Sequence, residues 1–400
     1  MSELSYLEKL LDGVEVEWLS LGELGDFIRG NGLQKKDFVE SGFPAIHYGQ
    51  IYTRYGLSAD KTFTYVLPEL ANKLRKAQKN DLLLATTSEN DEDVVKPLAW
   101  LGDNVAISGD MMLFRHEQNV KYLAYFFQSE IFQTQKMKYI TGAKVRRVSS
   151  GDLSKIKIPI PSSNNPEKSL TIQSEIVRIL DKFTALTAEL TAELTMRKKQ
   201  YNYYRDQLLS FDEGEVEWKM LGDLGENLDS KRKPITSGLR EAGSIPYYGA
   251  SGIVDYVKDY IFDGDFLLIS EDGANLLARN TPIAFSISGK SWVNNHAHVI
   301  KFDSYAERRY VEYYLNSIDL APYISGAAQP KLNKKNLESI RIPNPSPEDK
   351  ERIVSILDKF DALTNSINEG LPREIELRQK QYEYYRDLLF SFPRPETASN

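Results

Sequence analysis

The sequence predicts an α+β protein in which two mixed α/β domains are joined by two long helices that pair as an antiparallel coiled coil. Three observations lead to this prediction. Blocks of sequence recur in the same order in both halves, and two segments carry the apolar spacing of long helices. The stretches between them contain many short strand-like runs bounded by glycine, asparagine and aspartate. The predicted architecture is pseudo-twofold and circularly permuted.

Four recurring blocks set the domain organisation. Residues 26–141 and 226–325, which lie between the blocks, show no obvious similarity to each other. The chain therefore predicts one shared scaffold that holds two different modules. The blocks of the first half are Glu15–Trp18, Leu21–Gly25, Ile176–Phe183 and Lys199–Asp206, and their counterparts are Glu215–Trp218, Leu221–Gly225, Ile353–Phe360 and Lys380–Asp387.

A shorter echo at the start of the chain indicates the permutation. Tyr6, Leu10 and Leu11 have the spacing of Tyr204, Leu208 and Leu209, and each set precedes Glu-Val-Glu-Trp. We therefore expect the N-terminal helix to pack on the C-terminal shared region. The predicted boundaries are 1–12 for that helix, 13–161 for the first mixed domain, 162–212 for the central helix, 213–345 for the second mixed domain, 346–392 for the C-terminal helix and 393–400 for a tail.

The spacing of apolar residues predicts one long helix over 166–211 and a second that starts at Pro347. Asn165 and Ser346 are the expected N-caps, each followed by proline at the first helical position. Steps of three and four are typical of a coiled-coil seam, and Gly370-Leu371-Pro372 should interrupt the second helix. A dimerisation coiled coil without another role is the simpler alternative. The predicted seam and docking residues are Phe183, Leu186, Leu190, Leu194, Tyr201, Tyr204, Phe360, Leu363, Tyr382 and Tyr385.

Composition and motifs favour a binding or scaffold protein without catalytic residues. The 400 residues include no cysteine, which excludes disulfides and cysteine nucleophiles. No signal peptide or membrane-length apolar run is present, so we expect a cytoplasmic protein. Gly289-Lys290-Ser291 fails as a P-loop because Ala284 stands where glycine is required. His296 and His298 alternate along a predicted strand without further ligands at metal-site spacing, so no metal is expected.

Basic residues cluster at corresponding places in the two halves, although the net charge is −7. Lysine and arginine bind phosphates, while arginine, glutamine and asparagine can also read base edges. We therefore predict DNA contacts, and solvated loops with ordinary surface lysines are the alternative. The predicted contacts of the first half are Arg29, Lys35, Lys36, Tyr48, Gln50, Tyr52, Arg54, Lys144, Arg146 and Arg147. Those of the second half are Lys231, Arg232, Lys233, Tyr247, Tyr248, Asn294, Asn295, Gln329, Lys331, Lys334 and Lys335.

Together these features closely resemble the specificity subunits of type I restriction-modification enzymes, of the IC kind. The resemblance covers essentially the whole chain, and its departures lie in the variable regions. It rests on Glu15–Trp18, on Ile176–Thr195 with its tandem Thr-Ala-Glu-Leu, on Lys199–Phe211, on Gly370–Asp387, and on the Ile158–Pro161 and Ile342–Pro345 segments.

The resemblance implies that each mixed domain is a target-recognition domain reading one half of a split, asymmetric site in double-stranded DNA. The shared helices would form a spacer and dock two adenine N6-methyltransferase subunits, and two restriction subunits would complete the ATP-dependent enzyme. S-adenosylmethionine, ATP and Mg²⁺ would belong to those partners, with no cofactor or membrane bound by this chain. In the family, the copy number of the four-residue repeat goes with the spacer length, and two copies belong to the shorter form.

Two other interpretations stay open. The same scaffold could act alone, as a bipartite DNA-binding protein or an antirestriction protein. The chain could also be an enzyme whose site the sequence motifs do not reveal. Co-purification with a methyltransferase would distinguish a subunit of the restriction-modification complex from a stand-alone protein. Methylation of DNA by this chain alone would support the interpretation as an enzyme.

Overall fold

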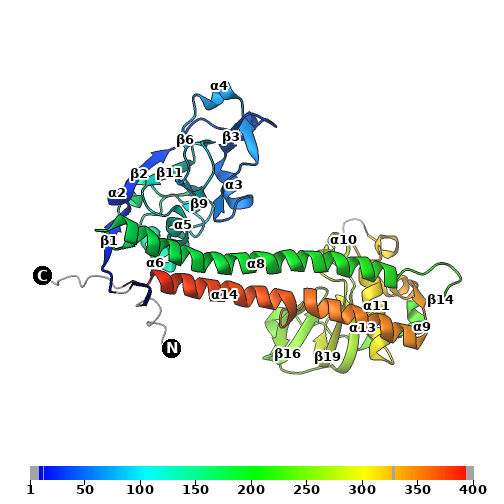
Figure 1. The fold of residues 1–400 in the computed structure, drawn as a ribbon. Coiled ribbons are helices and arrows are strands. Elements are labelled where there is room, and N and C mark those ends of the chain that lie inside the picture. The colour runs from blue at the N-terminus through cyan, green and yellow to red at the C-terminus, as the bar shows by residue number, and fades with distance from the viewer. Residues whose placement is uncertain (1–8, 12, 327–328, 393–400) are drawn as a thin grey trace. The chain divides into compact units, whose positions relative to one another are not determined.

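The computed structural model of the chain describes residues 9–11, 13–326 and 329–392, and it divides into two compact units. Unit 1 comprises Met1–Glu189 with Ile375–Asn400, and unit 2 comprises Leu190–Glu374. The division falls within helix α8 (Pro166–Leu208), inside the tandem repeat. Each unit combines a mixed sheet with helices, as Figure 1 shows, and the predicted fold class is confirmed.

Unit 1 contains a five-stranded sheet with the order β2-β11-β7-β9-β4, whose strand β7 is buried along its whole length. Helix α5 (Val120–Gln128) packs against β7 and β9, and α6 (Glu130–Met137) follows it. The strands are β2 (Gly25–Arg29), β4 (Ser58–Ala59), β7 (Leu82–Ala85), β9 (Lys96–Trp100) and β11 (Met111–His116). A second sheet has the order β5-β3-β10-β6, with β3 (Phe43–Ile46), β5 (Thr64–Val66), β6 (Lys76–Ala77) and β10 (Val105–Ile107).

Unit 2 contains a six-stranded sheet with the order β15-β20-β18-β19-β16-β17. Helix α11 (Tyr305–Ser317) packs against β18 and β19. The segment Gly289-Lys290-Ser291, which fails as a P-loop in sequence, lies inside β19 and pairs with β18. The strands are β15 (Glu226–Asn227), β16 (Ala242–Gly249), β17 (Gly252–Val257), β18 (Phe262–Ser270), β19 (Ala284–Val293) and β20 (Ala297–Lys301).

The sheets of the two units have the same core strand order, although the sequences of the variable regions are dissimilar. The order β2-β11-β7-β9 in unit 1 matches β15-β20-β18-β19 in unit 2, and all neighbours in both cores are antiparallel. A further strand, β4 or β16, then pairs parallel to the last strand of the core. In each unit the core continues along the chain into one helix, α5 or α11. The two variable modules therefore have a common topology.

The recurring blocks close each unit with a two-stranded ribbon. In unit 1, β1 (Val16–Ser20) pairs with β13 (Lys157–Pro161), and in unit 2, β14 (Glu217–Met220) pairs with β21 (Arg341–Asn344). The recurring tryptophans face prolines, in the pairs Trp18↔Pro159 and Trp218↔Pro343. Four short helices flank these ribbons: α2 (Leu21–Leu24), α7 (Ser150–Leu153), α9 (Leu221–Leu224) and α12 (Lys334–Glu338).

The long helices begin where their caps predict. The Asn165 side chain accepts a hydrogen bond from the Lys168 amide at the start of α8, and Ser346 accepts one from Asp349 at the start of α13 (Pro347–Thr364). The chain then leaves the helix for a few residues and resumes as α14 (Gly370–Phe390). Gly370 has φ +73°, and a Cβ there would lie 2.3 Å from a carbonyl oxygen of α13, so only glycine fits this junction. The second helix is interrupted, as predicted, but the break lies at residues 365–369, and Gly370-Leu371-Pro372 form the first turn of α14 and not the break itself.

The helices pair through matched aromatic contacts in both units. Phe183 of α8 stacks on Tyr385 of α14 in unit 1, with ring centroids 5.3 Å apart. Tyr204 of α8 stacks on Phe360 of α13 in unit 2, at 5.7 Å. Early residues of α8 thus contact late residues of the chain, and later residues of α8 contact earlier ones. The pairing is therefore antiparallel, as predicted.

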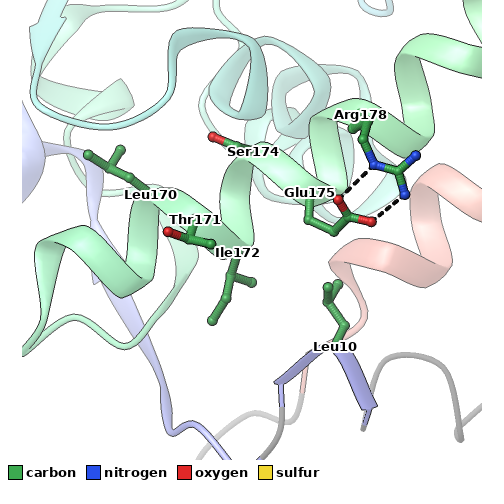
Figure 2. A pocket seen from close by; sticks show the side chains of 7 residues that line it. All are labelled: Leu10, Leu170, Thr171, Ile172, Ser174, Glu175 and Arg178. Atoms are coloured by element: carbon green, nitrogen blue, oxygen red, sulfur yellow. Dashed lines mark hydrogen bonds and ion pairs between the residues drawn. The ribbon is translucent and has the colours of Figure 1, made fainter.

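The described N-terminal residues, which repeat the spacing of Leu208 and Leu209, pack against the C-terminal helix region within unit 1, as predicted. Residues 9–11 are helical, and Leu10 and Leu11 pack against the core cluster that holds Leu389 and Phe390. Figure 2 shows Leu10 beside the first turns of α8, across a pocket that Ile172 and other residues of α8 also line. Tyr6 and the tail at 393–400 lie outside the described residues. Among the helices of the described ranges, none has both the length and the apolar character to cross a membrane.

Candidate DNA interface

In each unit one residue of the early basic cluster, Arg29 or Arg232, lies with the late basic segment at one edge of the shared sheet core. Strand β2 ends at Arg29, β7 ends at Ala85 and β11 begins at Met111, so these three ends meet because the strands are antiparallel neighbours. In unit 2, the ends of β15 and β18 and the start of β20 form the corresponding edge. These residues, which are far apart in the sequence, converge here.

Backbone contacts tie the clusters of unit 1 together. The Arg29 guanidinium donates to the Gly109 carbonyl at 2.9 Å, and the neighbouring Asp110 carbonyl accepts from the Thr86 amide at 3.1 Å. The next two residues form β8 (Thr87–Ser88), which pairs with β12 (Arg146–Arg147). Arg29 and the 141–147 segment are therefore joined through the residues that follow β7.

Residues 141–147 form a closed loop at this edge, which we call loop 1. The backbones of Thr141 and Arg147 exchange two hydrogen bonds of 2.9 Å. Arg146 donates to the Gly142 carbonyl within the loop at 2.6 Å and forms an ion pair with Asp91 at 2.8 Å. Lys144 and Arg147 are exposed and have no ion pair within the described part of the chain. Arg146 thus holds the loop, while its neighbours are open to a ligand.

The acidic segment that carries Asp91 is anchored from inside the unit. Lys136 is completely buried, and its ammonium donates to the carbonyl oxygens of Glu92 and Val94 at 2.8 and 3.0 Å. Burial lowers the pKa of Lys136 to about 8, while the nearby carboxylates, Asp93 foremost, oppose that shift. The Tyr52 hydroxyl donates to the Thr87 carbonyl at 2.9 Å. These contacts fix the segment against which Arg146 pairs.

Unit 2 has a matching loop at residues 325–331, which we call loop 2. The backbones of Ser325 and Lys331 exchange hydrogen bonds of 2.9 and 2.8 Å. The Lys331 ammonium pairs with Glu271 at 3.0 Å, and the Leu332 amide donates to the Glu271 carbonyl at 2.7 Å. Glu271 directly follows β18, whereas Asp91 lies beyond β8, the short strand that comes after β7. Residues 327–328 of the loop lie outside the described ranges.

A buried ion network supports loop 2. Glu271 accepts from Arg232 at 2.6 Å, and His298 lies between the Asp229 carboxylate, at 2.6 Å, and the Leu332 carbonyl, at 2.7 Å. Burial raises the pKa of Asp229, but the hydrogen bond from His298 and other favourable contacts outweigh it, so that pKa is lowered. The pKa of Glu271 is lowered in the same way, because Arg232 and Lys331 outweigh its burial.

The donor atoms of Asp229, Glu271 and His298 lie within 4.8 Å of one another, which is close enough for a metal ion. Both ring nitrogens of His298 already face acceptors, and each carboxylate oxygen of Glu271 already meets a cation. A metal would have to displace these contacts, so the geometry fits an ion network better. Sequence spacing did not connect these residues because they come from three separate segments, and His296 turns instead to Asp272.

Several predicted contact residues are engaged inside the protein. Gln50 is buried and caps α3 (Tyr48–Thr53) by accepting from the His47 amide, and Tyr247 is buried and hydrogen-bonded to Ile235. Asn294 is buried as well, and Tyr48, Tyr52, Arg232 and Tyr248 are half-buried. These side chains support the edge, and a DNA role for them stays a prediction. The exposed predicted residues are Arg29, Lys35, Lys36, Arg54, Lys144, Arg147, Lys231, Lys233, Asn295, Gln329, Lys331, Lys334 and Lys335.

A family model for the type I restriction modification DNA specificity domain matches residues 13–196 and again residues 213–377. The chain belongs to the type I restriction-modification DNA specificity family. Each match begins just before a recurring Glu-Val-Glu-Trp block and ends within one of the long helices. The repeat found in the sequence is therefore a repeat of the family's domain.

Relatives in this family match the chain over its full length. The specificity subunit of the type I restriction enzyme EcoR124I/EcoR124II from Escherichia coli is 43% identical, with 100% of both chains covered. The EcoprrI specificity subunit from Escherichia coli is 38% identical over 92% of this chain and 93% of its own. The crystal structure of the S subunit of a type I restriction-modification system from M. genitalium shares the fold, with a TM-score of 0.58, 16% identity, and 96% and 98% of the two chains covered.

The shared helices of this specificity-family chain expose matched pairs of tyrosines. Tyr203 and Tyr204 are 62% and 40% exposed, and Tyr384 and Tyr385 are 47% and 37% exposed. The rings of each pair meet edge to face at 5.4 and 5.3 Å. We call these the unit 2 and unit 1 tyrosine pairs, respectively. Exposed aromatic residues of this kind are enriched at protein interfaces.

Proposed function

We propose that this chain is the DNA-reading subunit of a type I restriction-modification complex and that each unit reads one half of a split, asymmetric DNA site. The observation that carries the proposal is the matched edge of the two units, where a closed loop meets a basic cluster on a common sheet core. Two units with the same sheet core but different side chains at the matched edge are suited to reading two different short DNA sequences. The family membership and the full-length relatives support this function.

The exposed cations supply the sequence-independent part of binding. Lys35, Lys36, Lys144 and Arg147 in unit 1 project into solvent, and none forms an ion pair within the residues described. Such cations bind phosphates and release counterions, which positions a protein on the duplex without selecting a sequence. Because the whole chain is acidic, partner subunits are expected to provide part of the positive surface around the DNA.

The tyrosine pairs are the proposed docking sites for two adenine N6-methyltransferase subunits, one for each unit. The pairs occupy corresponding positions in the recurring block Lys199–Asp206 and its counterpart, so two copies of one partner can bind in the same way. Two restriction subunits would complete the assembly, which we assign to the IC type. In this proposal the chain itself is non-catalytic and works in the cytoplasm. S-adenosylmethionine, ATP and Mg²⁺ are used by the partners.

Co-expression with a type I methyltransferase subunit tests the proposal. We expect size-exclusion chromatography with light scattering to give one copy of this chain with two methyltransferase subunits. Sequencing of methylated adenines in the host DNA should then reveal one split motif. A monomer that binds a split site but ignores the methyltransferase would instead indicate a stand-alone DNA-binding protein. Methylation by this chain alone would indicate an enzyme.

A further inference from the structure

Helices α5 and α11, which follow the equivalent sheet cores, share a local sequence pattern. Lys121–Ser129 aligns with Arg309–Ser317, with a cation first, tyrosines second and fifth, and an amide before the final serine. The first of these tyrosines is completely buried in both helices. The final serine donates its hydroxyl hydrogen to the carbonyl three residues earlier, at 2.7 Å in both. The two helices therefore occupy equivalent places in their units.

In unit 1, helix α5 holds one carboxylate of the long helix α8. The Lys121 ammonium pairs with Asp181 at 2.5 Å, and the Tyr125 hydroxyl donates to the same carboxylate at 2.7 Å. Lys121 and Tyr125 lie about one helical turn apart, so both can reach a single carboxylate. Burial raises the pKa of Tyr125, and its hydroxyl therefore keeps the proton that it donates. We call this arrangement the unit 1 clamp.

In unit 2, helix α11 holds a carboxylate of α13 in the same way. The Arg309 guanidinium pairs with Asp358 at 3.0 Å, and the Tyr313 hydroxyl donates to that carboxylate at 2.6 Å. Tyr305 donates to the other oxygen of Asp358 at 2.8 Å. Burial raises the pKa of Tyr313, as it does for its counterpart in unit 1. We call this arrangement the unit 2 clamp.

The aspartate of each clamp belongs to the shared scaffold, while the cation and the tyrosine belong to the variable module. Asp181 and Asp358 occupy the same position in the recurring block Ile176–Phe183 and its counterpart. Each clamp therefore joins a variable module to an invariant point on the long helices. Two modules of different sequence use the same contact.

A second tie between the same helices shows that this agreement is specific to the clamps. Gln173 and Lys350 stand at equivalent scaffold positions, and both are buried. Gln173 accepts from the Asn119 amide at 3.0 Å, whereas the Lys350 ammonium donates to Glu307 at 2.6 Å. These ties differ in chemistry from one unit to the other. The clamped aspartate, in contrast, meets a cation and a tyrosine in both.

Each clamp lies beside one of the tyrosine pairs. Two residues after the clamped aspartates, Phe183 stacks on Tyr385 and Phe360 stacks on Tyr204. These tyrosines belong to the unit 1 and unit 2 tyrosine pairs, the proposed docking sites of the methyltransferase subunits. The recognition module and the methyltransferase of each unit would thus be seated on the same short stretch of the long helices.

We propose that Asp181 and Asp358 are positioning residues for DNA methylation. Each clamp sets the orientation of its recognition module on the long helices, and so places the adenine of that half-site in the methyltransferase docked beside it. The inference rests on the proposed function, since it assumes that the units read DNA and that the tyrosine pairs dock methyltransferases. Neither aspartate reads the DNA, because the candidate interface is formed by the strand ends and loops at the edge of each module.

The test uses the complex with methyltransferase subunits and the variants Asp181→Asn and Asp358→Asn. Asparagine keeps the size of the side chain and can still accept from the tyrosine, but it loses the ion pair. The methylation rate of each adenine is measured at saturating DNA, and base preference is measured with duplexes substituted in either half-site. We expect Asp181→Asn to lower the rate at one adenine by about tenfold or more, since misplacement by about 1 Å can cost about 100-fold. Asp358→Asn should do the same at the other adenine, and both variants should keep their affinity and base preference.

Two further variants separate positioning from stability. Lys121→Asp should slow methylation in the half-site of unit 1, and the added change Asp181→Lys should restore it by rebuilding the ion pair in reverse. Val66→Ala is the matched control, because Val66 is completely buried in a different core cluster of unit 1 from Tyr125. It should lower the unfolding midpoint and leave both methylation rates unchanged.

Unchanged rates in both aspartate variants would overturn the inference, and so would an equal loss at both adenines. A loss of base preference in the altered half-site would place the aspartate in support of the DNA edge and overturn it too. A reversed pair as slow as Lys121→Asp alone would also contradict the positioning role. Failure of the proposed function looks different, because the unaltered complex would then methylate no split site.

Discussion

A third Thr-Ala-Glu-Leu copy, inserted after Leu194, tests whether α8 sets the distance between the two reading sites. The helix is continuous from Pro166 to Leu208, and the chain passes from unit 1 to unit 2 between Glu189 and Leu190. Four added residues lengthen a helix by about 6 Å and rotate it by about 40°. This shift equals roughly one to two base-pair rises of about 3.4 Å.

The insertion should be tolerated because it avoids the cores. All fully buried residues of α8 precede Asp181, and Leu186 in the repeat region is 37% exposed. The repeat also adds a leucine at the seam spacing, so the cost is one further stutter. The matched control is Thr191→Ala, which changes the repeat without changing its length.

Sequencing of methylated adenines gives the readout. We expect the unread gap to lengthen by one to two base pairs, while both half-sites keep their sequence and the control variant keeps the original gap. An unchanged gap in the insertion variant would refute the role of α8 as a ruler. Loss of all methylation by an assembled complex would count against it as well, because the seam should survive the insertion.

Three further outcomes follow from the contacts within the units. Lys136→Met leaves the buried Val94 carbonyl and the part-buried Glu92 carbonyl without this donor, so we expect unit 1 to lose about 1–3 kcal/mol for the first and less for the second in denaturant unfolding, and an unchanged midpoint would contradict this. The pKa of Glu271 is lower in the folded protein than its unfolded value near 4.5, so its ionised form stabilises the fold above pH 4.5, and this stability is lost as the pH falls through the folded pKa. Below pH 4.5 the melting temperature of Glu271→Gln should therefore decrease less steeply with falling pH than that of the unaltered protein. Equal slopes would argue against the ion network. Tyr203→Ser and Tyr384→Ser, which change the more exposed member of each pair and leave the helix-pairing Tyr204 and Tyr385 in place, should each remove one methyltransferase subunit in light scattering, and a retained pair of subunits would place docking elsewhere.

The elements that local chemistry dictates could be predicted from the sequence. Cap residues, apolar spacing and the recurring blocks located α8, α13 and the break near Gly370. The place where α13 ends was less predictable, since residues 365–369 carry no strong helix breaker before the glycine. The circular permutation could also be predicted from the sequence at the start of the chain. In the structure Leu10 lines a pocket with the first turns of α8, and Leu208 lines a pocket with the first turns of α13.

The common core of the two modules could not be predicted, because strand pairing there depends on contacts between distant segments and not on any shared local pattern. The same limit affected the site. Arg146 and Arg232 lie in basic runs of the sequence and were therefore predicted as DNA contacts, but each forms an ion pair with a carboxylate from a distant segment of the chain. Lys136 gave no signal at all, since a buried lysine and a surface lysine look alike in a sequence.

The central claim is that each unit reads its own half-site, and exchange of one module tests it most directly. Residues 26–147, which include loop 1, would be replaced by the equivalent segment of a relative from the same family, and methylated adenines would be mapped in cells that express the complex. The account predicts a new sequence in one half of the methylated motif, with the other half retained. A change in both halves, or in neither, would contradict it.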